Sequence, residues 1–131
     1  MKSALFRRLG TKAIEETRLE AGEITVHVVP GSNQLTVAVA GRTTVDSSPN
    51  LRPVLLGLLR SSTTPVVVID LSALSYLDLS GIATLLEALK AARERSVKLR
   101  LAGMSGQVRA LAEIVQLDTI YRNWGSEVEF C

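Results

Sequence analysis

Apolar and polar residues alternate in two stretches, 24–29 and 35–41, and this period of two predicts a pair of β-strands. The residues between them, Pro-Gly-Ser-Asn, are typical of a tight turn, so we expect a hairpin. Residues 66–71 are nearly all apolar, a pattern typical of a central strand with both faces covered. Two later stretches, 97–103 and 127–130, predict a further strand and a short edge strand.

Three other stretches repeat apolar residues every three or four positions, which predicts amphipathic helices. The first begins behind Ser47 or Ser48, which suit an N-cap, and has Pro49 in its first turn. The second covers about 80–95 and the third covers 105–116. The inward positions are Leu51, Val54, Leu55, Leu58 and Leu59 in the first helix, Ile82, Leu85, Leu86 and Leu89 in the second, and Val108, Leu111, Ala112 and Val115 in the third.

The elements therefore follow in the order β-β-α-β-α-β-α. Strand–helix–strand units with short connections need right-handed crossovers, and these produce parallel strand pairs. We expect an α/β fold: a small mixed sheet of four to five strands with amphipathic helices mainly on one face, formed by residues 23–131. Residues 1–22 carry basic and then acidic side chains around a narrow apolar stripe. We expect a helical or flexible N-terminal extension there, with a surface-bound amphipathic helix as the alternative.

Composition narrows the class of protein. The 131 residues suit one domain, and 47% hydrophobic residues with only 4% aromatic ones predict an aliphatic core. The net charge of +2 does not call for a polyanionic partner, and no aromatic residues interleave the basic run 90–100, so nucleic-acid binding is not expected. The single cysteine, Cys131, and the absence of a secretory or membrane-spanning apolar run indicate a cytoplasmic protein without an integral membrane segment.

Catalytic and cofactor chemistry finds little support in the residues. His27 is the only histidine and lies within a predicted strand, so we expect it to be structural. One histidine and one cysteine exclude the usual zinc clusters, and no phosphate-binding glycine loop or nucleophile elbow occurs. We therefore expect a protein that is not an enzyme and needs no metal or cofactor.

The stretch Asp78-Leu79-Ser80-Gly81 is the most distinctive, because it joins a strand pattern to a helix pattern. Ser80 is placed where the helix begins, facing unpaired backbone N–H groups and the positive end of the helix dipole. An anion attached to its hydroxyl would be stabilised there, so Ser80 is a good candidate for phosphorylation. The alternative is that Asp78 or Ser80 is simply an N-cap and that Gly81 eases a tight turn.

The combined pattern resembles the STAS domains, the family of anti-sigma factor antagonists and their relatives. The run 66–82 resembles the signature region of that family, the residues Gly41-Arg42-Thr43-Thr44 leading to Leu51-Arg52 resemble its loop and first helix, and 99–117 its last strand and helix. The resemblance covers about residues 24–124. It implies a small sheet with amphipathic helices and no enzymatic activity.

In the antagonist branch, the residue just before the glycine is phosphorylated by a kinase that is also the anti-sigma factor. The resemblance places the phosphoacceptor at Ser80 and the loop acid at Asp78. The unphosphorylated form binds the anti-sigma factor and frees the sigma factor, and a PP2C-type phosphatase restores it. The chain departs from the family at Leu79, where Ser or Thr is frequent, and at Thr44, where an acid is frequent.

We expect the partner surface to combine the turn 78–82 with the loop 42–48. Its predicted partner-binding residues are Thr43, Thr44, Asp46, Ser47 and Leu79. Leu79 is expected to be an exposed apolar anchor, whereas Ile82 begins the apolar stripe and should be core.

Two other functions remain open. The first is a STAS binding subunit that is never phosphorylated, within a lipid-transport or signalling complex, and Leu79 favours it. The second is a small-ligand or nucleotide-sensing domain.

Overall fold

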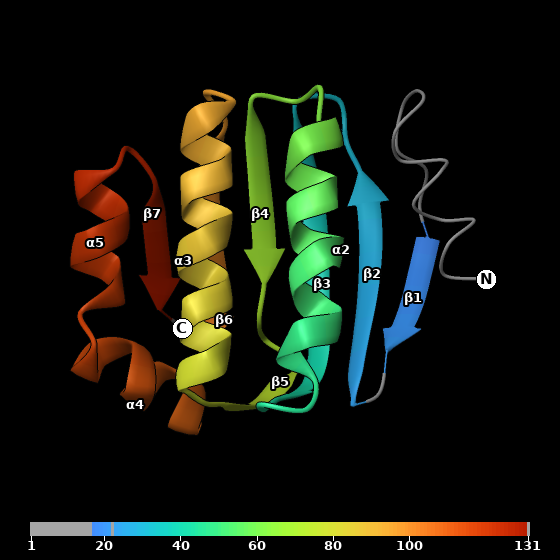
Figure 1. Cartoon of the computed structure of the whole chain (residues 1–131). Helices are drawn as coiled ribbons and strands as arrows, with labels where there is room; N and C mark the ends of the chain where they lie inside the picture. Colours follow the sequence, from blue (N-terminus) through green and yellow to red (C-terminus); the bar gives the residue numbers. More distant parts are fainter. Residues whose placement is uncertain (1–16, 22, 131) are drawn as a thin grey trace.

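A computed structural model describes residues 17–21 and 23–130 (Figure 1). Its single mixed sheet has the strand order β1-β2-β3-β4-β6-β7, with a short β5 paired to β3. Figure 1 shows the long helices α2 and α3 lying side by side across the same face of this sheet. The elements are β1 (Thr17–Ala21), β2 (Ile24–Pro30), β3 (Gln34–Thr43), α2 (Ser48–Ser61), β4 (Val66–Asp70), β5 (Leu74–Leu77), α3 (Leu79–Glu94), β6 (Lys98–Met104), α4 (Gly106–Ile114), α5 (Leu117–Asn123) and β7 (Glu127–Phe130).

The α/β class, the hairpin and the parallel crossovers are confirmed. Strands β2 and β3 pair antiparallel, whereas β4 pairs parallel with both β3 and β6. The expected edge strand at Glu127–Phe130 exists as β7 and pairs parallel with β6. The helices expected at 80–95 and after Ser47 exist as α3 and α2.

The sheet has more strands than the four to five expected. Strand β3 is long enough to pair with β4 along its first half and with β5 along its second half. The segment Leu74–Leu77, which the periodicity leaves as a connector, is therefore the four-residue strand β5. Pairing along a neighbouring strand supplies the backbone hydrogen bonds that a run too short to show its own pattern needs.

Residues 17–21 also form a strand, β1, that pairs antiparallel with β2. Their sequence pattern predicts a helical or flexible extension, and for these five residues that prediction is wrong. The antiparallel hairpin with β2 satisfies their backbone groups, which outweighs a weak helical stripe. The expectation for 1–16 and 22 lies outside the described residues.

The core lies between the sheet and the two long helices. The alternating residues of β2 and β3 that face α2 and α3 are no more than 2% exposed, and the apolar stripes of both helices are buried against them. Strand β4 departs from the expected double burial, because Val67 and Ile69 are buried while Val66 and Asp70 are partly exposed. The other face of β4 is not covered by the two long helices. Val68 lies on that face and is nevertheless buried, at 8% exposure.

The third predicted helix, 105–116, exists as α4, and a further helix that the periodicity does not predict, α5, follows it. Helix α4 ends at Ile114, and Gln116 adopts a left-handed conformation with φ of 56° before α5 begins. Tyr121 in α5 is fully buried, and its hydroxyl donates a 2.6 Å hydrogen bond to the Leu85 carbonyl in α3. Burial raises the pKa of Tyr121, so the hydroxyl remains a donor and holds α5 against α3.

Candidate functional site

The β5–α3 turn places a serine and a leucine at the surface next to a capping carboxylate. Asp78 is the N-cap of α3, and its Oδ1 accepts from the Gly81 N–H at 3.1 Å. The Ser80 hydroxyl donates to the same Oδ1 at 2.5 Å, and Ser80 itself is partly exposed. Leu79 is 67% exposed, whereas Ile82 is 5% exposed. The expected difference between an exposed Leu79 and a core Ile82 is therefore confirmed.

Ser80 also meets a second serine, from the start of α2. The Ser48 and Ser80 hydroxyl oxygens lie 2.8 Å apart, although the residues are 32 positions apart in the sequence. An ionised carboxylate only accepts, so the single Ser80 proton goes to Asp78 and Ser48 donates to Ser80. The result is a chain of donors from Ser48 through Ser80 to Asp78, with Ser48 only 5% exposed.

Gly81 is required by close packing and not by a left-handed turn. A Cβ built at Gly81 would overlap the Thr43 hydroxyl oxygen and a methyl group of Leu77. Both neighbours are buried, at 1% and 0% exposure, so neither has free space to move into. The absent side chain lets the first turn of α3 approach the end of β3, which brings Ser80 to the loop after that strand.

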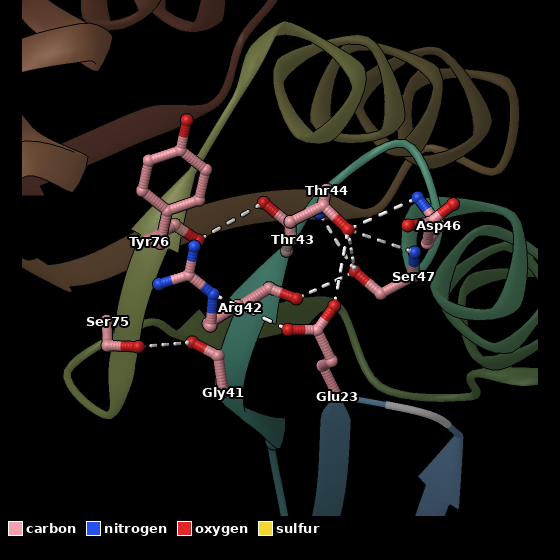
Figure 2. A network of polar contacts seen from close by, with 9 residues as sticks. All are labelled: Glu23, Gly41, Arg42, Thr43, Thr44, Asp46, Ser47, Ser75 and Tyr76. Carbon is pink, nitrogen blue, oxygen red and sulfur yellow. Dashed lines mark hydrogen bonds and ion pairs between the residues drawn. The ribbon is translucent and has the colours of Figure 1, made fainter.

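That loop, residues 43–47, is held by its own hydrogen bonds (Figure 2). The Ser47 hydroxyl donates to the Arg42 carbonyl at 2.7 Å and accepts from the Thr44 N–H at 2.8 Å. The Thr44 hydroxyl oxygen accepts from the Asp46 N–H at 3.2 Å. These bonds make a compact turn between β3 and α2.

The loop presents fewer of the predicted contact residues than expected. Thr43 and Ser47 are 1% and 2% exposed, so their side chains do not lie on the surface, and that part of the prediction is wrong. The Ser47 hydroxyl holds the loop, and the Thr43 hydroxyl donates to the Tyr76 carbonyl in β5 at 3.4 Å. Thr44 is partly exposed and Asp46 is exposed, so they remain candidates. Val45, which was not predicted, is 70% exposed.

The Arg42 side chain, near the end of β3, contacts residues of two other segments, Tyr76 in β5 and Glu23 before β2 (Figure 2). The Arg42 guanidinium lies 4.6 Å from the centre of the Tyr76 ring and 3.4 Å from a Glu23 carboxylate oxygen. The Ser75 hydroxyl donates to the Gly41 carbonyl at 3.0 Å. Gly41 has a φ of 109° and no room for a Cβ beside the Glu23 carbonyl, so only glycine fits there.

Comparisons with known proteins agree with this geometry. The family model described as "Mlab, STAS domain" matches residues 26–122. The chain belongs to the STAS-domain family. An anti-sigma-B factor antagonist of Staphylococcus aureus is 33% identical over 94 residues, which cover 71% of this chain and 86% of that relative.

Solved STAS structures share the fold. An anti-sigma factor antagonist from Mycobacterium paratuberculosis matches with a TM-score of 0.66 and 22% identity, covering 78% of this chain and 86% of that one. The Bacillus cell fate determinant SpoIIAA in its phosphorylated form matches with a TM-score of 0.57 and 12% identity, covering 79% and 89%.

Within this STAS domain the predicted loop residues come together as one site. Asp78, Leu79, Ser80 and Gly81 form a single turn, and the hydroxyl contact with Ser48 joins it to the loop 43–47. Sequence reasoning missed Ser48, because nothing local indicates which residue Ser80 meets across the fold. Val45 was missed too, although an apolar residue between polar neighbours in a loop could have drawn attention to it.

The potential metal ligands of the described residues are not gathered into one group. No group of three or more His, Cys, Asp or Glu residues in the described part of the chain could hold a metal ion. His27 lies within β2, opposite Ala38 of β3. No described helix is long and apolar enough to cross a membrane.

Proposed function

We propose that this STAS domain is a cytoplasmic anti-sigma factor antagonist whose partner binding is switched by phosphorylation of Ser80. The observation that carries the proposal is a partly exposed serine at the start of α3, directly beside a 67% exposed leucine. Its partner is an anti-sigma factor with serine kinase activity, and a PP2C-type phosphatase reverses the modification. The antagonist relative from Staphylococcus aureus supports this class of partner.

The surface that would meet the partner has an apolar centre and a polar rim. Leu79 and Val45 are 67% and 70% exposed and come from the two segments that the Ser48–Ser80 contact joins. Exposed apolar side chains in such a setting act as anchors, while Thr44 and Asp46 provide polar contacts around them.

Phosphorylation changes both the charge and the hydrogen bonds of the turn. In the transfer, the Ser80 oxygen bonds to the γ-phosphorus of ATP, the bond to the bridging oxygen breaks, ADP leaves and the hydroxyl proton is released. The phosphate adds about −1.5 to −2 charges. The start of α3 stabilises this charge within the domain by about 0.3–1 kcal/mol.

The released proton is the one that Ser80 donates to Asp78 in the unmodified turn. The carboxylate and the phosphate then face each other without a proton between them, so the turn must rearrange. A bound partner would bury this excess negative charge unpaired, and burial of one such charge costs several kcal/mol. A loss of about 4 kcal/mol weakens binding about a thousandfold.

The test uses purified anti-sigma factors with serine kinase activity from the same organism. Each is incubated with ATP and this protein, the phosphate is located by mass spectrometry, and affinity is measured by titration calorimetry. We expect stoichiometric phosphate on Ser80 and a large loss of affinity. Ser80→Ala should bind constitutively and Ser80→Asp more weakly, with Ser72→Ala, at an exposed serine of the turn between β4 and β5, as the control.

Two results would contradict the proposal. Stoichiometric phosphate on Ser72 or Ser75 instead of Ser80 would show that the site is assigned wrongly. Wild-type affinity in both Ser80→Ala and Ser80→Asp would show that Ser80 is not the switch.

A second candidate function is a STAS binding subunit that is never phosphorylated. The exposed Leu79 beside Ser80 favours it, because an apolar anchor at this position suits a permanent contact. The family model that matches the chain also carries the description "Mlab, STAS domain". Tight binding to a transport or signalling subunit, with no phosphate on Ser80 under any kinase, would select this candidate.

A further inference from the structure

The backbone of Leu77, the last residue of β5, forms hydrogen bonds with a side chain of α4, a helix that is distant in sequence. The Gln107 side-chain Nε2 donates to the Leu77 carbonyl at 2.6 Å, and the Leu77 N–H donates to Gln107 Oε1 at 2.9 Å. The residues are 30 positions apart, and Leu77 is fully buried. The orientation of the amide is fixed, because the peptide carbonyl can only accept and the peptide N–H can only donate.

This pair of bonds takes the place of a neighbouring strand. Among the described strands, β5 pairs only with β3, with Thr43 opposite Leu77. Gln107 lies in the first turn of α4, which packs against β5, and its amide supplies one donor and one acceptor to the backbone of β5. A carboxamide has the same donor and acceptor groups as a peptide unit, so it can satisfy a strand in this way.

The position of Leu77 gives the contact its importance. Leu77 is directly followed by Asp78, the N-cap of α3, whose carboxylate accepts from both Gly81 and Ser80. The direction in which the chain leaves β5 therefore sets where the Asp78 carboxylate and the Ser80 hydroxyl point. By fixing the backbone of Leu77, Gln107 restricts the conformations of the β5–α3 turn, and it does so from α4 and not from the loop 43–47.

We propose that Gln107 is a positioning residue for the Ser80 turn. Its side-chain amide bonds to the backbone of Leu77, and it acts on the turn through that backbone. Its role in phosphorylation and binding rests on the proposed function, whereas its effect on the turn does not. Helix α4 is thereby coupled to the candidate switch, although the periodicity of the sequence assigns it only to the core.

The test compares wild type with Gln107→Met, which keeps a similar length but removes both hydrogen-bonding groups. Glu113→Met is the matched control, because Glu113 is exposed on the same helix and pairs only with Arg109 among the contacts described. Amide hydrogen exchange measured by NMR reports the backbone bond directly. We expect about tenfold faster exchange at Leu77 in Gln107→Met, since a net hydrogen bond corresponds to a factor of roughly ten.

The Gly81 amide, which donates to Asp78, should also exchange several-fold faster, while amides in β2 stay unchanged. Gln107→Glu keeps an acceptor for the Leu77 N–H, so its Leu77 amide should exchange more slowly than that of Gln107→Met. A role in general folding alone would not produce this pattern, and thermal melts should place all three variants within a few degrees of wild type.

The functional arm measures kcat/KM for Ser80 phosphorylation and the affinity for the same purified kinase anti-sigma factors. We expect both to fall about fivefold in Gln107→Met and to be unchanged in Glu113→Met. Unchanged Leu77 exchange in Gln107→Met would overturn the proposal. So would faster exchange at Leu77 with unchanged Gly81 exchange, phosphorylation and affinity.

Failure of the proposed function has a different signature. In that case wild type itself is neither phosphorylated nor bound by any of the kinases. The exchange rates of Leu77 and Gly81 then decide alone whether Gln107 positions the turn: faster exchange at both supports it, and unchanged Gly81 exchange overturns it.

Discussion

Helices α2 and α3 each have a serine in the first turn, and the hydroxyls of these two serines are in contact, yet the two helix starts differ in what they expose to solvent. At the start of α2, Ser47 and Ser48 are 2% and 5% exposed. At the start of α3, Leu79 is 67% exposed and Ser80 is partly exposed. The serines at the start of α2 are therefore buried in the structure, whereas the serine at the start of α3 reaches solvent in part.

The two beginnings also differ in how they are capped. Asp78 caps α3 in the ordinary way, with its carboxylate on the Gly81 N–H. Ser47 is the N-cap of α2, but its hydroxyl makes no capping bond to the helix and instead joins Arg42 to Thr44. One cap serves its helix, and the other serves the loop before its helix. A serine at a helix start is a candidate switch only where its hydroxyl is not already needed to hold a loop through buried hydrogen bonds.

The largest expected effect tests whether the buried Ile82 contributes to stability while the exposed Leu79 contributes to partner binding. Ile82→Ala should lower the free energy of unfolding by about 2–5 kcal/mol, because it empties a core position. Leu79→Ala should change stability by less than about 0.5 kcal/mol and still reduce partner affinity. Thermal melts and a binding titration on both variants measure this. A Leu79→Ala protein that melts far below wild type would place this leucine in the core.

The second prediction concerns the close approach of α3 to the loop. Gly81→Ala should cost about 1–3 kcal/mol, because the new methyl group overlaps two buried side chains, Thr43 and Leu77. This exceeds the gain of up to about 1 kcal/mol from replacing a helical glycine. Urea unfolding measures the loss. Adding Thr43→Ala, which removes one of the overlapping atoms, should recover part of it, and additive losses would argue against the overlap.

A smaller effect is expected where the two helix starts meet. Ser48→Ala and Ser80→Ala each remove one end of the 2.8 Å hydroxyl contact. A double-mutant cycle by chemical unfolding should give a coupling free energy of about 0.5–1.5 kcal/mol, the usual net value of one hydrogen bond. A coupling indistinguishable from zero would mean that the two helix starts are independent.

The smallest effect comes from the ion pair between the exposed faces of the same helices. Arg52 contacts Glu87 through two hydrogen bonds of 2.7 and 2.8 Å, with both side chains about half exposed. The hydrogen bond from Arg52 lowers the pKa of Glu87. The pair therefore stabilises the fold above the ordinary carboxylate pKa of about 4.3, and this stabilisation is lost as the pH falls through the lower folded value.

Solvent screening keeps this contribution small. Urea unfolding between pH 7 and pH 3 should show a slightly smaller loss of stability for Glu87→Gln than for wild type. Equal losses in the two proteins would show that the pair contributes nothing, and the contact between the helix starts would then be the more important link.

Much of the fold could be predicted because the local spacing of apolar residues indicates the helices and strands and their buried faces. The alternation at 24–29 and 35–41 records which face of the hairpin is buried, and the stripe from Ile82 to Leu89 records the inner face of α3. The turn 78–81 was recognisable for the same reason, since a cap and a glycine before an apolar stripe mark a helix start. Strands β1 and β5 could not be predicted, because they form by pairing with β2 and β3 and have no clear strand pattern of their own.

The sequence by itself thus determined the α/β class, the inner faces of the helices and the place of Ser80 at a helix start. Only the tertiary structure decided which side chains of the loop 43–47 reach solvent. The polar Thr43 and Ser47, which were expected at the surface, are buried, while the apolar Val45 is exposed. Periodicity records the average direction of a face. Exposure at a loop instead depends on contacts between residues some 30 positions apart, such as Ser48 with Ser80 and Gln107 with Leu77, which no local pattern contains.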